Sequence, residues 1–350
     1  RQQVVDHAVQ AFTAQGPDVR RLVEQMERAG AVRRWRGTVG TIGADGSFHT
    51  RDEAADGPLW IGSSKSGIGS VADWLASGQE VLRDVWVAKL DHVEGGGWAL
   101  LDQRGRRVGK EPSYSYVAMA HNGKCADRLI NTAPFKTAAH APLRCKFTPT
   151  ASASSDRLEL SSLWVCVLRA PHGAVAFDGA FVEGSAVLSW AGNNSAKYPP
   201  QGGSGESAAD AWTLISTPQY GSANKCPQES IPDAVRHKVS GEMRQAFAKL
   251  AGVDGRSLEV LHLQLWGAAV PLNVCAQHFL HDPEARVGVC GDWLTSPSVE
   301  GALFSGLALA EALEKQLRGG GLAGPGVQRF VGLADCHAIG SFVACDAGLT

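Results

Sequence analysis

One strand–loop–helix unit near the end of the chain constrains the fold more than any other feature. The segment RVGVCGDWLTSPSVEGALFSGLALAEAL covers residues 286–313, and it begins as an apolar strand that ends at Gly291-Asp292. A helix is predicted over residues 298–317, because Pro297 and Ser298 form a helix-start pair and apolar residues then recur at helical spacing. A buried strand that leads into a helix is typical of an α/β protein.

The start of that helix is a candidate site for an anion or a polar ring. The unpaired amides and the dipole of a helix N-terminus together favour a negatively charged oxygen. Asp292, at the end of the strand, is placed to accept hydrogen bonds from sugar-like hydroxyls. Small residues in the first two turns let the helix lie very close to another backbone or a ring: Gly301, Ala302, Ser305 and Gly306. Spacing alone does not separate this site from an ordinary strand–loop–helix unit.

The rest of the chain mixes helices with strands. Apolar residues at helical spacing predict helices over residues 18–30, 70–75 and 233–250. Apolar and β-branched runs predict strands over residues 58–61, 81–90, 98–101, 114–120, 158–168, 181–190, 211–217 and 260–266. These strands suggest a mainly antiparallel sheet, and an irregular stretch over residues 133–156 suggests a crossing between domains.

Composition limits the classes of protein that the chain can represent. Its 350 residues are 44% hydrophobic and 19% charged with a net charge of -2, which is ordinary for a globular chain of two domains. No long run of one charge indicates a nucleic-acid partner, and no apolar run approaches the roughly 20 residues that span a bilayer. The 8 cysteines form no C-x-x-C pair, so we expect reduced thiols, no metal site and an intracellular location.

The pattern G-D-x(6)-V-E-G-A-x-x-S-G resembles the C-terminal flavin motif of the amine-oxidase superfamily, which includes renalase and the monoamine oxidases. This resemblance implies that Gly291 and Asp292 meet the ribityl–pyrophosphate region of FAD. It also implies that Val299, Glu300 and Ala302 lie at the helix start that faces the pyrimidine edge of the flavin. The implied fold is a Rossmann-like FAD/NAD(P)-binding domain with an inserted α+β substrate domain whose sheet is mainly antiparallel.

Further segments extend the resemblance over most of the chain. AHNGKCADRL, ELSSLW, LSWAGNNSAK and LQLWGAA look like a plant and algal branch of renalase-like oxidoreductases. DHAVQAFT resembles a stretch that runs beside the flavin ring, which implies cofactor contacts by Asp6, His7 and Gln10. VWVAKL resembles a strand whose valine, here Val87, touches the adenine. YVAMAHNGK resembles a segment that closes over the cofactor, which implies a contact at Ala120.

The resemblance predicts an FAD-dependent oxidoreductase that takes a hydride from a small substrate, either an amine or a reduced nicotinamide species. Trp190, Asn193 and Trp266 are candidate walls of the substrate pocket. We expect residues 1–132 and 270–318 to form the FAD-binding domain, residues 133–269 the substrate domain, and residues 319–350 a tail. The expected location is the chloroplast or the cytoplasm.

The family normally begins with a strand, a G-x-G-x-x-G turn and an acidic residue, and nothing before Asp6 matches them. We therefore expect a chain that is incomplete at its N-terminus, with exposed apolar edges and weak or absent FAD binding. Two alternatives stay open. The turn at Gly67–Ala72 fits G-x-G-x-x-A and allows a NAD(P)-binding βαβ unit. The second alternative is that the chain is a non-catalytic interaction protein, which has kept the scaffold of the family and lost its cofactor.

Overall fold

The computed structural model describes residues 3–152, 154–199, 209–319 and 330–333, which form two compact units. Unit 1 takes its described residues from 3–77 and 161–270, and unit 2 takes them from 78–160 and 271–333. Both units mix helices with strands, so the predicted α/β class is confirmed. The chain passes between the units after Ser77, Leu160 and Val270, whereas the predicted domain boundaries lay after residues 132 and 269.

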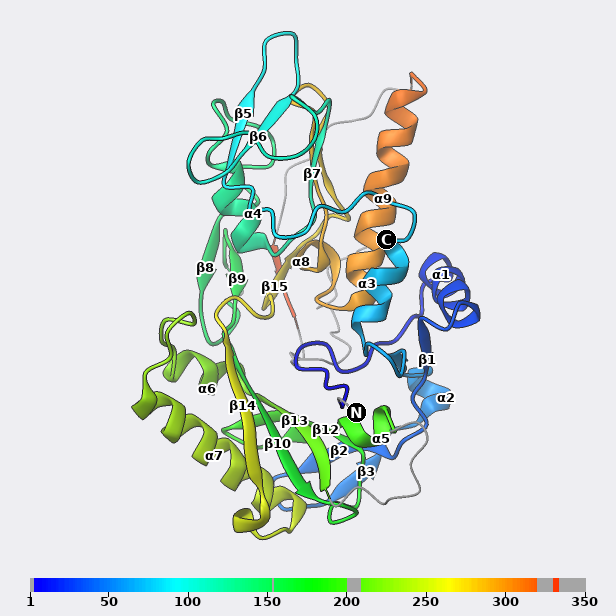
Figure 1. Ribbon diagram of the computed structural model, residues 1–350, viewed down its shortest axis with the longest axis vertical. Helices are drawn as coiled ribbons and strands as arrows, with labels where there is room; N and C mark the ends of the chain where they lie inside the picture. The colour runs from blue at the N-terminus through cyan, green and yellow to red at the C-terminus, as the bar shows by residue number, and fades with distance from the viewer. Residues whose placement is uncertain (1–2, 153, 200–208, 320–329, 334–350) are drawn as a thin grey trace. The chain divides into compact units, whose positions relative to one another are not determined.

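A seven-stranded sheet organises unit 1 (Figure 1), with the strand order β14-β10-β13-β12-β11-β2-β3. Every neighbouring pair is antiparallel except β11 with β2, which confirms the predicted antiparallel character. The elements of unit 1 are α1 (Pro17–Arg28), β1 (Val32–Arg34), β2 (Val39–Gly43), β3 (Phe48–Thr50), α2 (Glu53–Asp56), β4 (Trp60–Gly62), α3 (Gly69–Leu75), β10 (Leu163–Pro171), β11 (Gly179–Glu183), β12 (Leu188–Asn193), α5 (Asn194–Lys197), β13 (Ala209–Ser216), α6 (Pro218–Ala223), α7 (Asp233–Ala251), η1 (Gly255–Ser257) and β14 (Glu259–Trp266).

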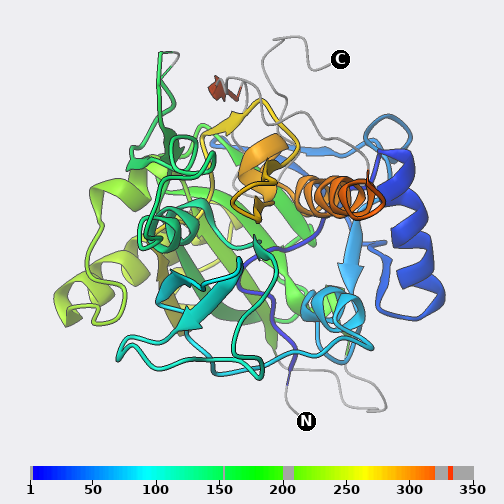
Figure 2. The ribbon, with the colours of Figure 1, turned by 90° about the horizontal axis from the view of Figure 1, so that it is seen from above.

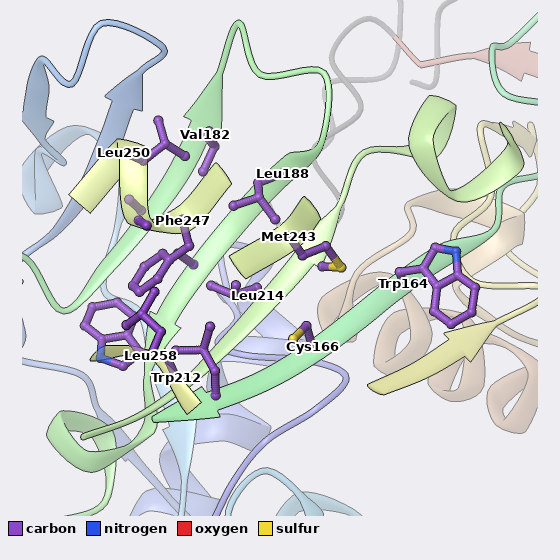
Figure 3. Packing of buried hydrophobic residues seen from close by; sticks show 14 of the residues in the cluster. Trp164, Cys166, Val182, Leu188, Trp212, Leu214, Met243, Phe247, Leu250 and Leu258 are labelled. Atoms are coloured by element: carbon purple, nitrogen blue, oxygen red, sulfur yellow. The ribbon is translucent and has the colours of Figure 1, made fainter. Parts of the chain in front are cut away.

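Helix α7 covers one face of this sheet (Figure 1), where Figure 3 shows its side chains among those of the strands. Met243 and Phe247 are fully buried against the cluster that contains Trp212 and Leu214. The rings of Trp212 and Phe247 lie 5.1 Å apart between centroids, which is within the range of favourable aromatic pairs. The helix ends at Gly252, whose φ of 67° suits a residue without a Cβ.

The opposite face of the sheet carries a second apolar cluster. Leu163, Val165 and Trp190 point to this face and pack with Ala11 from the segment that precedes α1. Ala11 and Phe12 are buried, and the backbone of Phe12 exchanges hydrogen bonds with that of Trp60 on β4. The segment before α1 is therefore built into unit 1 by both apolar burial and backbone hydrogen bonds.

Unit 2 contains several small sheets and one long helix, α9, which Figure 2 views along its axis. Strands β16, β17 and β7 form one sheet in which β17 and β7 run parallel, and no described strand pairs with the other edge of β7. The elements of unit 2 are β5 (Lys89–His92), β6 (Trp98–Leu101), β7 (Val117–Met119), α4 (Gly123–Ile130), β8 (Cys145–Phe147), β9 (Leu158–Leu160), β15 (Asn273–Cys275), β16 (Leu280–Asp282), β17 (Val287–Val289), α8 (Asp292–Thr295), α9 (Val299–Leu317) and β18 (Phe330–Gly332).

The predicted strand over residues 81–90 is wrong for most of its length. Strand β5 begins only at Lys89, because Asp84 adopts a left-handed backbone with φ of 58° that interrupts an extended run. Val81 and Trp86 are 54% and 58% exposed in this irregular stretch. Val87 lies in the same stretch and not on a strand, so its predicted role as a strand residue needs correction.

Other strand predictions need smaller corrections. The run over residues 181–190 is a hairpin of β11 and β12, with Gly184 in a left-handed conformation between them. The run over residues 158–168 divides into β9 and β10, which belong to different units. The predicted tail is structured in part, since β18 pairs antiparallel with β15. The rest of the tail, residues 320–329 and 334–350, lies outside the described residues.

The described residues also bear on the expectations about membrane spans, cysteines and metal sites. Of the helices that the structure describes, none has both the length and the apolar character needed to cross a bilayer. The 6 cysteines within the described ranges are free thiols: Cys125, Cys145, Cys166, Cys226, Cys275 and Cys290. In the same ranges, no three His, Cys, Asp or Glu side chains are grouped to hold a metal ion. The remaining two cysteines, Cys336 and Cys345, fall outside those ranges.

Candidate functional site

The parallel strands β7 and β17 end at the same edge of their sheet. Val289 is opposite Met119 in the register, and the amide of Cys290 donates to the carbonyl of Met119 at 3.0 Å. Ala120 therefore lies beside Cys290, and Gly291 continues the chain from the same edge. Ligands of parallel α/β sheets bind outside the carboxyl ends of the strands, so this edge is a candidate site.

The predicted strand–loop–helix unit is present, with the short helix α8 in its loop. Ser298 is the N-cap of α9, as predicted: its Oγ accepts from the amide of Gly301 at 2.9 Å and its carbonyl accepts from the amide of Ala302 at 3.0 Å. Ser305 is fully buried, and its Oγ accepts from the amide of Gly291 at 2.9 Å. The same hydroxyl donates to the carbonyl of His278 at 2.6 Å. Ser305 in the second turn of α9 is thus hydrogen-bonded both to the end of β17 and to the segment before β16.

Asp292 stands at the strand end with partial exposure. Its Oδ1 accepts a hydrogen bond from the amide of Trp293 at 2.9 Å. Burial of the carboxylate raises the pKa of Asp292 to about 6, although the hydrogen bond from Trp293 acts in the opposite direction. The carboxylate is therefore ionised at neutral pH, but it is poorly solvated and has little protein hydrogen bonding. A hydroxyl group of a ligand would satisfy its remaining acceptor capacity.

The small residues of α9 serve two different purposes. A Cβ on Gly301 would overlap the carbonyl oxygen of Ser296, so this glycine lets the loop before α9 lie against its first turn. A Cβ on Gly306 would meet no atom within 4 Å. Ala302, one turn earlier on the same side, is exposed. Ala302 and Gly306 thus leave open space along the first two turns of α9, and a flat ring system fits such a surface.

Unit 1 contains a buried polar cluster that the sequence did not predict. The Oδ2 atom of Asp6 accepts from Nζ of Lys197 at 3.1 Å and from the hydroxyl of Tyr198 at 2.6 Å. The side chains of Lys197 and Asp6 are 0% and 3% exposed. Burial lowers the pKa of Lys197 to about 8, and the negative charge of Asp6 opposes that shift. Burial also raises the pKa of Tyr198, with a further contribution from the same carboxylate.

The polar groups of Asp6 and Gln10 form hydrogen bonds within this cluster. Oε1 of Gln10 accepts from Lys197 at 2.9 Å, while its Nε2 donates to the carbonyl of Asp6 at 2.6 Å. The amide of Asp6 donates to Asn194 at 3.0 Å, and its carbonyl also accepts from Thr213 at 2.7 Å. The carboxylate of Asp6 and the amide of Gln10 are therefore satisfied within unit 1, and these groups are not needed to explain a cofactor contact.

His7 has a different environment from its neighbour Asp6. It is exposed, and its ring stacks on Trp266 with 5.9 Å between centroids and 10° between planes. His262, on the same face of β14 as Trp266, approaches His7 edge-on at 6.4 Å. Trp266 is half-buried, and its indole N–H has no hydrogen-bond partner among the described residues. Of the predicted residues in unit 1, His7 and Trp266 keep surface that a ligand can reach.

Packing and capping explain the other two predicted pocket residues without a ligand. Trp190 is 2% exposed and contacts the rings of Phe181 and Trp35, at 4.8 and 6.3 Å between centroids. Asn193 is buried, and its Oδ1 caps α5 by accepting from the amide of Ala196 at 3.1 Å. The assignment of Trp190 and Asn193 as pocket walls stays a prediction, and the contacts of both side chains are explained without a ligand.

The proposed nucleotide turn at Gly67–Ala72 needs correction. Strand β4 pairs antiparallel with β1, and β5, the next strand along the chain, pairs antiparallel with β6, so no βαβ unit forms around this turn. The amide of Ile68 donates to Oδ1 of Asp6 at 2.9 Å. A carboxylate of the protein therefore already lies at the start of α3, where a phosphate group would have to bind.

No family model matches this chain. Its fold is similar to a cyclohexylamine oxidase from Brevibacterium oxydans, at 14% identity and a TM-score of 0.44 over 72% of this chain and 53% of that one. A reduced UDP-galactopyranose mutase gives 11% identity and a TM-score of 0.44, over 75% and 52% of the two chains. A putative FAD-containing monooxygenase from Photorhabdus luminescens gives 12% identity and a TM-score of 0.42, over 92% of this chain and 82% of that one.

The chain spans about half the length of the cyclohexylamine oxidase and of the UDP-galactopyranose mutase. At these identities and TM-scores, the similarity assigns neither a family nor an activity to the chain.

Proposed function

We propose that this chain is an FAD-dependent oxidoreductase whose unit 2 holds part of the cofactor. When bound, FAD supplies the acceptor for a hydride from a small substrate. An amine or a reduced nicotinamide species is the donor that the resemblance to renalase and the amine oxidases favours. A cytoplasmic location stays a prediction from the expected reduced thiols, and a chloroplast location stays a prediction from the resemblance to the plant and algal branch.

One observation carries the proposal. Asp292 is a partly exposed, poorly hydrogen-bonded carboxylate just beyond the carboxyl ends of two parallel strands, and the Gly291 before it is hydrogen-bonded to Ser305 of α9. This is the position from which an acidic residue can accept hydrogen bonds from the hydroxyls of a nucleotide or a flavin side chain. The sequence motif around it resembles the flavin motif, so the geometry and the resemblance support the same assignment.

Different residues of unit 2 are assigned to different parts of FAD. We assign Asp292 to the ribityl hydroxyls and the amides near Val299 and Glu300 to an electronegative edge of the ring, because the dipole of α9 favours negative charge there. Ala302 gives the ring a surface without a side chain beyond Cβ. Ala120, at the end of β7, is exposed and can contact the cofactor through its backbone.

In unit 1 we assign His7 and Trp266 to the substrate. The face of Trp266 offers a large apolar surface, and an indole face also attracts a cationic group such as a protonated amine. The exposed imidazole of His7 adds a polar edge to that surface. No observation on Gly67–Ala72 favours the NAD(P)-binding alternative.

Titration of the purified chain with FAD tests this proposal, with quenching of flavin fluorescence as the signal. We expect saturable but weak binding with a Kd on the order of 100 µM, which corresponds to about −5.5 kcal/mol. Asp292→Asn is expected to raise the Kd about tenfold, because a neutral amide accepts hydrogen bonds less strongly than a carboxylate. Asp91→Asn, on β5 in the same unit, is the matched control and should leave the Kd unchanged.

Two results would contradict the proposal. Absence of saturable quenching up to millimolar FAD would favour a non-catalytic scaffold. An equal effect of Asp292→Asn and Asp91→Asn would show that FAD binds elsewhere on the chain.

A further inference from the structure

A cavity of about 520 Å³ opens in unit 2, and none of its lining residues belongs to the proposed cofactor site. Its walls come from the end of α4, from the irregular segment that follows, and from β8 and the residue before β9. The lining residues are Asp127, Asn131, Lys136, His140, Ala141, Arg144, Cys145 and Arg157. The volume is within the range of small-molecule sites, which is roughly 300–1,000 Å³.

The lining carries a clear excess of positive charge. Lys136, Arg144 and Arg157 are cationic, whereas Asp127 is the only carboxylate in the wall. Asp127 is already paired, because its Oδ2 accepts from Lys124 at 3.2 Å and its Oδ1 from Asn131 at 2.8 Å. Nε of Arg157 lies 3.9 Å from a carboxylate oxygen of Asp156, whereas neither Lys136 nor Arg144 has an ion-pair partner among the described residues. Their charges are therefore free to act on a ligand.

The cavity lacks an available nucleophile or base. Sγ of Cys145 donates to the carbonyl of Leu143 at 3.1 Å, and burial raises the pKa of this thiol to about 12. Nδ1 of His140 accepts from the amide of Thr137 at 2.9 Å, and burial together with Lys136 lowers the pKa of the imidazole. His140 is thus neutral, and its acceptor nitrogen is occupied. These features favour binding over catalysis at this site.

We propose that this cavity binds the phosphate group of a small phosphorylated molecule, with Arg144, Arg157 and Lys136 as its anchors. Guanidinium groups form paired hydrogen bonds with phosphate oxygens, and three cations match a group that carries close to two negative charges. The cavity is larger than one phosphate group, so an organic portion of the ligand fits beside it. This site is independent of the proposed cofactor site.

Isothermal titration of the full chain with sodium pyrophosphate, inorganic phosphate and phenyl phosphate tests the proposal. We expect one saturable site for at least one of these probes. Tighter binding of phenyl phosphate assigns an organic phosphomonoester as the ligand, and tighter binding of pyrophosphate assigns a diphosphate. Either outcome supports the proposal. Succinate, a dicarboxylate of similar charge, should bind at least tenfold more weakly than the best phosphate probe.

Substitutions then locate the site. Arg144→Gln and Arg157→Gln should each weaken binding about tenfold or more, and Lys136→Gln provides a third variant at an exposed position. Arg128→Gln is the matched control, because Arg128 is exposed on α4 but does not line the cavity. Three results would overturn the proposal: no saturable binding of any phosphate probe, equal binding of succinate, or an equal loss of affinity in Arg128→Gln.

Discussion

The carboxylate of Asp6 and the ammonium group of Lys197 meet at 3.1 Å inside unit 1, although 191 positions separate them in the sequence. Lys197 is satisfied by three acceptors, namely Asp6 and two oxygens of Gln10. The pair therefore holds the segment before α1, which also carries His7, to the short helix α5 that follows β12. The position of His7 depends on this buried pair.

Lys197→Met is expected to lower the free energy of unfolding by about 3–5 kcal/mol. Removal of one partner leaves the Asp6 carboxylate buried without a compensating cation, and such losses are much larger than those of surface pairs. Urea denaturation measures the change. Lys65→Met, at an exposed position, should stay within about 0.5 kcal/mol of the parent chain. The double variant Asp6→Asn, Lys197→Met should lose less than the sum of the two single losses.

Gly67→Ala should destabilise the chain more than Gly57→Ala. Both glycines adopt left-handed backbones, with φ of 62° and 76°, so both substitutions carry backbone strain. A Cβ on Gly67 would overlap Oδ1 of Asp6, whereas a Cβ on Gly57 would meet nothing within 4 Å. We expect the difference in free energy of unfolding to be about 1–3 kcal/mol. Equal losses would show that Asp6 moves aside without cost.

Asp292 should make stability depend on pH in the acidic range. Burial raises its pKa to about 6 from an ordinary value of 3.8, so the folded chain holds this proton more tightly than the unfolded chain. The contribution to stability is therefore fully present below about pH 4 and is lost as the pH rises through 6. Relative to Asp292→Asn, which does not titrate, the parent chain should lose about 2 kcal/mol between pH 4 and 7.

The difference between the two chains, measured by urea denaturation at several pH values, isolates this carboxylate from the other titrating groups. The side-chain oxygen of the substituted asparagine can still accept the hydrogen bond that the amide of Trp293 donates to Asp292, so the local fold is kept. A pH-independent difference would contradict the assigned environment of Asp292.

Substitutions at two glycines of α9 should have opposite effects. Gly306→Ala should stabilise the chain by about 0.5–1 kcal/mol, because alanine loses less backbone entropy in a helix and meets no neighbour here. Gly301→Ala should destabilise it by about 1–3 kcal/mol, because the added Cβ would overlap the Ser296 carbonyl. Thermal unfolding of both variants checks the sign. Two shifts in the same direction would show that the close approach at Gly301 has no energetic effect.

Local sequence signals predicted α1, α3, α7 and α9, but not the shorter helices α2, α4, α5, α6 and α8. The helical spacing of Val19, Val23 and Met26 places α1, and these residues are its buried face. Ser298 predicts the start of α9 through a hydrogen bond that involves only its own first turn. Such features depend on neighbours within a few residues, so one sequence contains the information for them.

Features that depend on distant residues were not predictable in the same way. Lys197 itself stands out in the sequence, because it is the only charged residue between Glu183 and Glu206. Its partner Asp6 is 191 positions away, and nothing in the sequence around Lys197 identifies it. The strand expected over residues 81–90 failed because a single backbone angle at Asp84 decides it. The pairing of β4 with β1, which removes the nucleotide turn, likewise comes from tertiary contacts that an apolar run does not specify.

The interleaving of the two units along the chain has a consequence for synthesis on the ribosome. Residues 78–160 of unit 2 emerge before residues 161–270, which all belong to unit 1. At about 5–20 residues per second, this first half of unit 2 waits roughly 5–20 s for strands β15, β16 and β17. Val117 and Met119 lack the partner strand β17 during that time. Chaperone binding to the nascent chain is therefore expected to concentrate on residues 78–160.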